Sequence, residues 1–164
     1  MQQTTKEKVV LLAEDDRTHE ALFRRALKQG GMECRLDVVH DGAEVIDYLF
    51  ATGGFTHRDP HDLPDLILLD LKMPKMNGIQ VLKVLRRVRW DDHARIPPVV
   101  VLTGSDDDRD ILEAYQWGAQ SYICKPMGFP DFSRTVQETL DYWLSLNRPV
   151  PRHRIGASFG DGPS

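Results

Sequence analysis

The chain has 164 residues, of which 41% are hydrophobic and 28% are charged. This length and composition are typical of one globular domain with a sizeable core, and they leave little room for a second domain. The formal net charge of −4 excludes an overall electrostatic attraction to nucleic acid or to an anionic membrane surface.

Short apolar runs alternate with amphipathic segments along the chain. Helical spacing of apolar residues predicts a helix after each run; Gly30-Gly31 ends the first of these helices, and a capping box of Ser105 and Asp108 is expected to open the fourth. The predicted strands are residues 9–13, 35–39, 66–69, 99–102 and 122–124. Five strands alternating with five helices predict an α/β fold, with a parallel sheet covered on both faces.

The remaining segments are predicted to be loops or termini. Residues 51–64 form a polar loop whose two histidines, His57 and His61, are expected to be ordinary hydrophilic residues rather than metal ligands. We predict one domain over residues 1–147 and a tail over residues 148–164 that is flexible or ordered by a partner.

The cysteines and the first residues indicate the compartment. Cys34 and Cys124 lie far apart and form no CxxC pattern, so free thiols in a reducing environment are expected. No apolar stretch resembles a signal peptide or a membrane span. We therefore expect a cytoplasmic protein that acts on neither membranes nor nucleic acid.

Polar side chains follow four of the predicted strands, where each strand ends. Each has an ordinary explanation, because acids and threonines often cap helices and a lysine before proline is usually exposed. The carboxyl ends of parallel strands share one edge of the sheet, however, so these side chains are expected to converge there. They are Glu14, Asp15 and Asp16 after the first strand, Asp70 after the third, Thr103 after the fourth and Lys125 after the fifth.

The chemistry of this set indicates a metal and a phosphoryl group. Neighbouring carboxylates repel each other and stay ionised only beside a cation. Oxygen ligands without His or Cys favour Mg²⁺ or Mn²⁺ over zinc. A carboxylate beside such an ion can attack phosphorus and form an aspartyl phosphate, while a lysine and a hydroxyl neutralise the phosphoryl oxygens.

The same residues resemble the receiver domain of two-component response regulators. The resemblance rests on Glu14-Asp15, the stretch 70–78 (DLKMPKMNG), Thr103 and Lys125-Pro126, in the order typical of that family, and it covers roughly residues 8–147. It implies a flavodoxin-like (βα)5 fold, a doubly wound parallel sheet with strand order 2-1-3-4-5. It also implies a signalling protein rather than an enzyme.

The resemblance implies a role for each residue of the site. Asp70 would accept a phosphoryl group from a histidine kinase. Asp15, Asp70 and the backbone carbonyl of Lys72 would bind Mg²⁺ directly, with Glu14 binding through water. Lys125 would contact the phosphoryl group, Thr103 would move toward it, and Tyr122 would swing inward together with Thr103. The resemblance further implies a cis peptide bond before Pro126.

Three residues near the site receive other expectations. Asp16 lies outside the acid pair of the family and is expected to cap the first helix. His19 is expected to be a surface residue near the kinase-docking face. Lys72 and Ser105 occupy the two positions that tune the phosphate lifetime in the family, and Lys72 departs from the smaller or acidic residue that is common there.

The finer resemblance is to stand-alone receivers paired with bacterial and cyanobacterial phytochromes. It rests on the long loop 51–64, on residues 95–98 (RIPP) and on residues 142–144 (YWL). It implies a light-sensing histidine kinase as partner and a homodimer joined through the fourth helix, the fifth strand and the fifth helix. A pseudo-receiver that acts as a protein-binding module and an intermediate receiver in a multistep phosphorelay stay open as alternatives.

Three other functions fit the residues less well. A haloacid-dehalogenase-type phosphatase has a second acid two residues after its nucleophile, where this chain has Lys72. A flavin-binding protein of the same fold needs a hydroxyl- and Gly-rich phosphate loop where this chain has three acids. A pseudo-receiver that only binds protein would have lost Asp70, Lys125 or the acid pair, and all are present.

Overall fold

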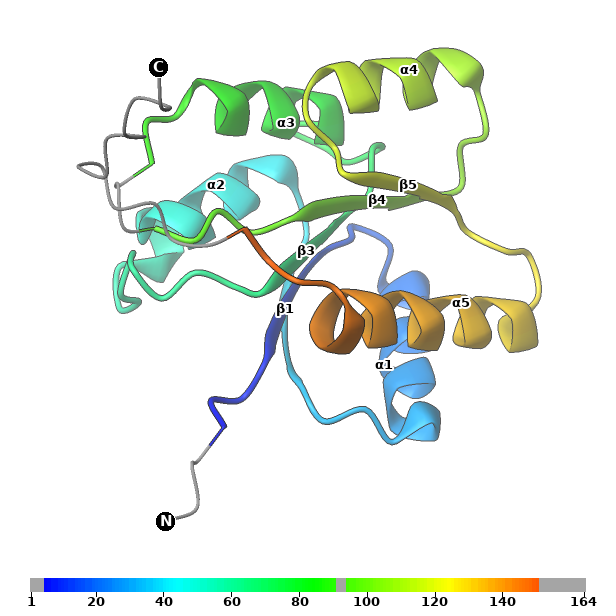
Figure 1. Cartoon of the computed structure of the whole chain (residues 1–164). Helices are drawn as coiled ribbons and strands as arrows, with labels where there is room; N and C mark the ends of the chain where they lie inside the picture. The colour runs from blue at the N-terminus through cyan, green and yellow to red at the C-terminus, as the bar shows by residue number, and fades with distance from the viewer. Residues whose placement is uncertain (1–4, 91–93, 151–164) are drawn as a thin grey trace, which may run out of the picture.

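The computed structural model describes residues 5–90 and 94–150, and its centre is one parallel sheet. The strand order β2-β1-β3-β4-β5 confirms the predicted doubly wound, flavodoxin-like fold (Figure 1). The strands are β1 (Val9–Ala13), β2 (Arg35–Val39), β3 (Leu66–Leu69), β4 (Val99–Thr103) and β5 (Ser121–Cys124). The helices are α1 (Arg17–Gly30), α2 (Gly42–Phe50), α3 (Gly78–Arg87), α4 (Asp108–Gln116) and α5 (Phe129–Asp141).

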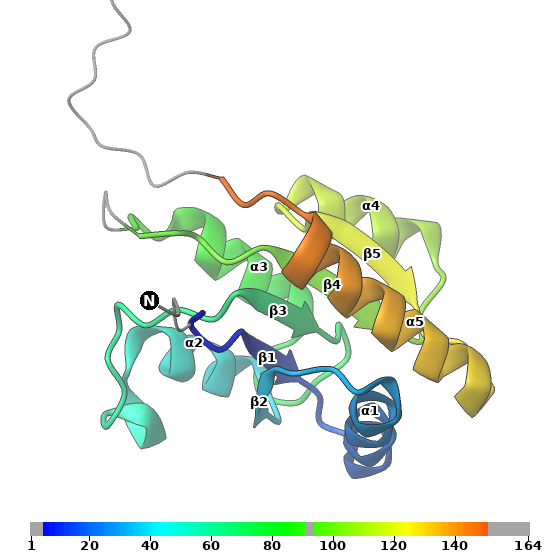
Figure 2. The ribbon, with the colours of Figure 1, turned by 60° about the horizontal axis from the view of Figure 1, so that its bottom comes forward.

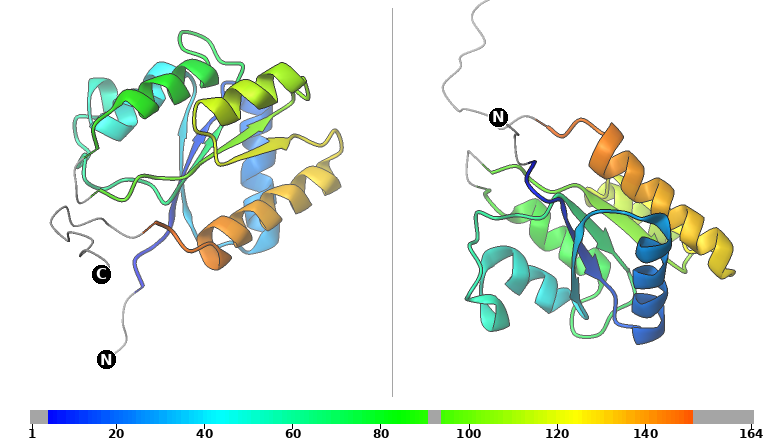
Figure 3. Two further views of the ribbon diagram at one scale, coloured as in Figure 1. Left: turned by 45° about the horizontal axis from the view of Figure 1, so that its top comes forward. Right: turned by 90° about the horizontal axis from the view of Figure 1, so that it is seen from below.

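Helices cover both faces of the sheet. Figures 2 and 3 show α1 and α5 on one face and α2, α3 and α4 on the other. Each face holds its own apolar cluster, one around Leu12 and Phe23 and the other around Ile67 and Leu82. The three central strands are buried along their whole length, as continuous apolar runs in parallel sheets require, whereas β2 and β5 at the edges are only half-buried.

The register of the strands aligns their carboxyl ends. Ala13 pairs with Leu69, and Thr103 pairs with Cys124. The residues that follow keep this alignment: the Asp70 amide donates to the Ala13 carbonyl at 3.1 Å, and the Lys125 amide donates to the Thr103 carbonyl at 2.7 Å. The polar residues after these strands therefore emerge along one edge.

Capping residues fix where the helices begin and end. The Asp16 carboxylate accepts from the Thr18 and His19 amides, so the predicted cap is confirmed, and Gly31 ends α1 in the left-handed region with φ 60°. The capping box predicted from Ser105 and Asp108 is wrong. Asp107 caps α4 instead, because its carboxylate accepts from the Arg109 amide at 2.8 Å.

The loop between β3 and α3 packs closely against the backbone of Asp70. A Cβ atom on Gly78 would lie 2.4 Å from the Asp70 carbonyl oxygen, a distance that no side chain tolerates. The Gly78 amide donates to the Leu71 carbonyl at 2.9 Å. Asn77 starts α3 with a complete capping box, so the Asn77-Gly78 pair both turns the chain and allows this close approach.

Two segments complete the described chain. The loop after α2 contains a short 3₁₀ turn, Gly53–Phe55, and α5 continues into a π-helical turn, Tyr142–Leu146. Residues 148–150 of the predicted tail are irregular, and residues 151–164 lie outside the described residues. No helix within the described ranges has the length and apolar character needed to cross a membrane.

Tyr48 contacts both the loop after α2 and the edge strand β2. Its hydroxyl donates to the Asp37 carboxylate at 2.6 Å, and the Arg58 guanidinium lies 3.5 Å from the ring centroid. Phe55 meets the same ring edge-to-face at 5.5 Å. Burial and the hydrogen bond to Asp37 raise the pKa of Tyr48 to about 12, so the folded chain favours the neutral phenol.

Replacing Tyr48 with Phe is expected to lower the free energy of unfolding by about 1 kcal/mol near neutral pH, through loss of the hydrogen bond to Asp37. Because the pKa is raised from 10.0 to about 12, the contribution of this phenol is complete below pH 10 and declines as the pH rises toward 12. Urea unfolding of both proteins across this range measures the difference. A difference that stays constant up to about pH 11 would contradict the assignment.

Candidate phosphoryl-accepting and metal site

Three carboxylates meet at the carboxyl edge of the sheet. Oxygen atoms of Glu14, Asp15 and Asp70 all lie within 4.8 Å of one another, and in the described part of the chain they form the only group of three or more side chains suited to hold a metal ion. Glu14 and Asp70 are buried, whereas Asp15 is exposed. We call these three residues the acidic cluster.

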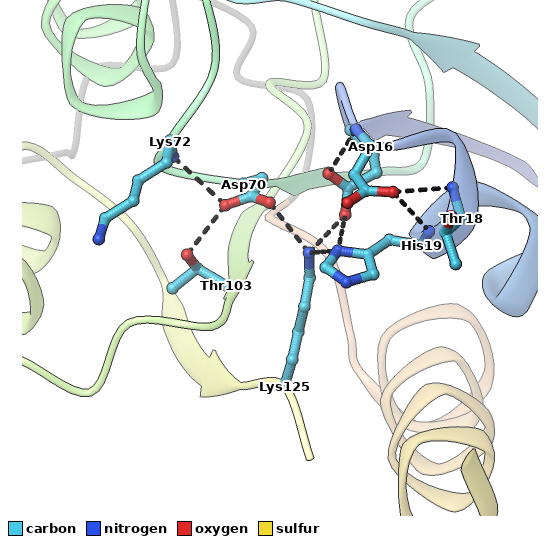
Figure 4. A network of polar contacts seen from close by, with 8 residues as sticks. Asp16, Thr18, His19, Asp70, Lys72, Thr103 and Lys125 are labelled. Atoms are coloured by element: carbon cyan, nitrogen blue, oxygen red, sulfur yellow. Dashed lines mark hydrogen bonds and ion pairs between the residues drawn. The ribbon is translucent and has the colours of Figure 1, made fainter. Parts of the chain in front are cut away.

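Lys125 brings a positive charge from β5 into the acidic cluster (Figure 4). Its ammonium lies 2.9 Å from Asp70 Oδ2, bonds to Glu14 Oε1, and lies 3.1 Å from His19 Nδ1. The side chain is only 9% exposed. Three polar side chains thus lie within hydrogen-bond distance of one ammonium, which has three donors.

Burial and pairing have opposite effects on these charges. Burial raises the pKa of the Glu14 carboxyl, and the Lys125 ammonium offsets part of that rise. Burial lowers the pKa of Lys125, but the neighbouring Asp70 and Glu14 carboxylates raise it by more, so its pKa lies above the ordinary value. Lys125 therefore stays charged at neutral pH, as a partner of buried carboxylates must.

The Asp70 carboxylate is held on both of its oxygens. Oδ1 accepts from the Thr103 hydroxyl at 2.9 Å and from the Lys72 amide at 3.3 Å, while Oδ2 faces Lys125. Thr103 is buried, so its hydroxyl is placed by the end of β4. The Lys72 side chain points away from the carboxylate in Figure 4. The arrangement fixes the orientation of the Asp70 side chain.

Tyr122 lies on the face of the sheet that α4 covers. Its ring packs with the apolar cluster of α2, α3 and α4, and its hydroxyl donates to the Ser105 carbonyl at 2.8 Å. Ser105 lies two residues after Thr103, and its own hydroxyl donates to Asp110 of α4. Tyr122 thus connects β5 to the loop that joins Thr103 to α4.

The cis peptide bond predicted before Pro126 is wrong for this structure. The described residues contain no cis peptide bond, so Lys125 and Pro126 are joined in trans. An X–Pro bond favours trans by about 0.5–1 kcal/mol unless tertiary contacts select the other isomer. Lys125 reaches Asp70 and Glu14 from the trans backbone.

His19 belongs to the site, which the sequence analysis did not predict. Its side chain is partly exposed, as expected, but Nδ1 also lies 3.3 Å from Glu14 Oε1, next to Lys125. Its position in the sequence could have indicated this role, because His19 lies in the first turn of a helix that starts directly after the acids. His57 and His61 belong to no group of three or more metal-binding side chains within the described residues.

The donor set fits a hard divalent cation. It consists of carboxylate oxygens, which Mg²⁺ and Mn²⁺ prefer, and no described cysteine or histidine joins it. Asp16 takes no part, because its carboxylate caps α1. The acidic cluster is therefore suited to bind a divalent metal beside the carboxylate of Asp70.

The chain matches a known protein family over most of its length. The model of the response regulator receiver domain matches residues 10–137. The chain belongs to this family. The match contains the whole site, from Glu14 to Lys125. Receivers are signalling proteins of two-component systems.

The receiver is similar to curated regulators over most of its length. It is 39% identical over 140 residues to the probable methanogenesis regulatory protein FilR2 of Methanothrix harundinacea, covering 85% of this chain and 86% of that protein. It is 34% identical over 137 residues to the response regulator Rcp1 of Synechocystis, covering 84% and 89%.

The receiver also resembles solved structures of response regulators. The phosphorylated cyanobacterial phytochrome response regulator RcpA superposes with a TM-score of 0.77 at 31% identity, covering 87% of this chain and 98% of that one. The Mn²⁺-bound form of Rcp1 superposes with a TM-score of 0.75 at 31% identity, covering 87% and 99%. The receiver is thus similar in both sequence and structure to the phytochrome response regulator RcpA and to the response regulator Rcp1.

Replacing Asp15 with Asn should weaken Mn²⁺ binding by about tenfold or more, because it removes one charged ligand from the acidic cluster. Asp15 is exposed, so the fold should tolerate the change. Isothermal titration of the wild type and the variant with MnCl₂ measures the effect.

Asp16→Asn is the matched control, since asparagine also caps helices well and Asp16 lies outside the acidic cluster. It should bind Mn²⁺ nearly as the wild type does. Equal losses in both variants would mean that the titration reports general surface charge and not a defined site.

Proposed function

We propose that this receiver accepts a phosphoryl group on Asp70 from a phosphohistidine of a histidine kinase. The observation that carries the proposal is the convergence of Thr103 and Lys125 on the two oxygens of the Asp70 carboxylate, beside two further acids. The phosphorus–nitrogen bond breaks as a phosphorus–oxygen bond forms to Asp70, and the imidazole leaves with the electron pair. Positioning and charge neutralisation are the main requirements of such a transfer.

Each residue of the site has a role in this transfer. The Lys72 amide holds Asp70 Oδ1 in place, and Thr103 and Lys125 are placed to contact one phosphoryl oxygen each. Asp15, Asp70 and the Lys72 carbonyl would hold Mg²⁺, with Glu14 acting through water. The ion supplies positive charge that offsets the cluster and the incoming phosphoryl oxygens. Lys72 and Ser105 are the positions proposed to tune the phosphate lifetime.

The new charge on Asp70 is proposed to change the surface formed by α4, β5 and α5. A phosphoryl group draws Thr103 and Lys125 toward it, and the loop after Thr103 carries Ser105, whose carbonyl binds Tyr122. Two packings of this loop and Tyr122 would then differ in population. The output passes through protein contacts, since the acidic net charge gives no general attraction to nucleic acid.

A phytochrome-type histidine kinase is the proposed upstream partner. The similarity to RcpA supports it, because RcpA is described as a cyanobacterial phytochrome response regulator. The comparable similarity to FilR2, described as a probable regulator of methanogenesis, favours a different sensor and is the reason to keep a second candidate. An intermediate position in a phosphorelay uses the same Asp70 chemistry.

Self-association through α4, β5 and α5 is part of the proposal. Several apolar side chains are exposed on these elements or next to them, and such residues mark contact surfaces when they gather on one face. They are Leu112, Tyr115, Met127, Tyr142 and Leu146. The division into a receiver over residues 1–147 and a tail over 148–164 also stays a proposal, with the tail able to extend this contact.

Incubation with acetyl phosphate and Mg²⁺ should add the mass of one phosphate to the wild type, read by intact mass spectrometry. Asp70→Asn should add none, and a chelator should abolish the gain in the wild type. Lys125→Met should reduce it strongly, because Lys125 is the buried cation beside Asp70. A phosphate that survives Asp70→Asn would show that another residue is the acceptor.

Replacing Leu112 with Asp should weaken self-association about tenfold or more, because Leu112 is 61% exposed on α4 and the charge would need to be desolvated at the interface. Sedimentation velocity of the phosphorylated and unphosphorylated proteins measures it. Ile96→Asp is the matched control: Ile96 is also an exposed apolar residue, at 55% exposure, but it belongs to the segment before β4 and not to α4, β5 or α5. If the wild type dimerises and the Leu112 variant sediments as the wild type does, the interface lies elsewhere.

A further inference from the structure

A second concave site lies between α3, the turn after α4 and the segment that leads into β4. It is a cavity of about 230 Å³ that opens to solvent. Figure 3 shows α3 and α4 side by side above the sheet. The floor is apolar and consists of Ile67, Leu82 and Val99, all buried, of which Ile67 and Val99 belong to the entering halves of their strands. Asp70 follows the opposite end of β3, so this cavity and the acidic cluster are separate sites.

Two tryptophans line the cavity, and neighbouring side chains hold both of them. The Lys83 ammonium lies 5.1 Å from the Trp117 ring centroid. The Trp90 ring packs against Phe50 with 5.7 Å between centroids. Each indole therefore has a contact that limits its rotation, and two large aromatic surfaces border one small volume.

Arg86 adds a positive charge at the rim. It is an exposed residue of α3, and its Nη1 atom would lie 3.7 Å from a Cβ on Gly118, so the guanidinium spans from α3 to the turn after α4. Across the described residues no carboxylate lies within ion-pair distance of Arg86, although Lys83 in the same helix pairs with Glu113 at 3.6 Å. A guanidinium without a carboxylate partner is suited to bind an anion.

We propose that this cavity binds a small aromatic carboxylate, with its ring between the indoles and its carboxylate on Arg86. The volume suits such a ligand, because an apolar cavity of about 150 Å³ already admits benzene, and about 230 Å³ leaves room for a short acidic side chain. The apolar floor accepts the ring, and the few polar groups at the rim orient it, as in most small-molecule sites.

The test uses phenylacetate and its neutral isostere phenylacetamide, with NMR of the indole N–H signals of the ¹⁵N-labelled full chain. The chain has three tryptophans. Phenylacetate should shift the signals of Trp90 and Trp117 in a saturable manner, with a Kd on the order of 1 mM for so small a ligand. Trp143 packs in the other apolar cluster and should not move. Phenylacetamide should bind about tenfold more weakly, because it carries no charge for Arg86.

Arg86→Gln should remove the preference for the acid, so that both probes bind equally weakly. Arg87→Gln is the matched control, because Arg87 is the next residue of α3, is also exposed, and does not line the cavity. It should bind phenylacetate as the wild type does. The proposal is overturned by the absence of a saturable shift at about 10 mM phenylacetate, by equal binding of acid and amide to the wild type, or by equal shifts of all three indoles.

Discussion

The Lys125 ammonium, placed between Glu14 and Asp70, is the interaction on which the site depends. Two buried carboxylates from different strands would repel each other, and burying them without a counter-charge is costly. Lys125 comes 111 residues after Glu14, so only the parallel sheet brings the two together. The order β2-β1-β3-β4-β5 and the shared direction of its strands are therefore requirements of the site and not only of the core.

The charges at this edge also explain why a divalent cation suits it. Three carboxylates and one ammonium leave two negative charges when all are ionised, which one divalent ion would balance. A phosphoryl group on Asp70 replaces one carboxylate charge by about two, so the balance shifts again and the cations must rearrange. Lys125 already contacts Glu14, Asp70 and His19. Contact with a phosphoryl oxygen therefore changes the set of groups around its ammonium.

Much of the fold and the site could be predicted from the sequence, because both depend on strong local signals. Unbroken apolar runs mark the central strands, and the polar residues after them lie at one edge in any parallel sheet. The position of His19 was missed because it depends on a three-dimensional contact: His19 faces the cluster because α1 turns it there. The cap of α4 was missed because several neighbouring acids can each cap a helix. The trans bond before Pro126 was missed because only tertiary contacts select a proline isomer.

The helix α4 is the element that both ends of the sheet can influence. Among its residues only Ala114 is buried, so few apolar contacts hold it to the sheet, and helices of this kind are the first to change packing. The carboxyl edge contacts α4 through Ser105 and Asp110, and the opposite end contacts it through Trp117, which directly follows the helix. A ligand shifts such an element only if it binds one packing more tightly than the other. A phosphoryl group on Asp70 and an anion beside Trp117 would therefore cooperate or compete according to whether they favour the same position of α4.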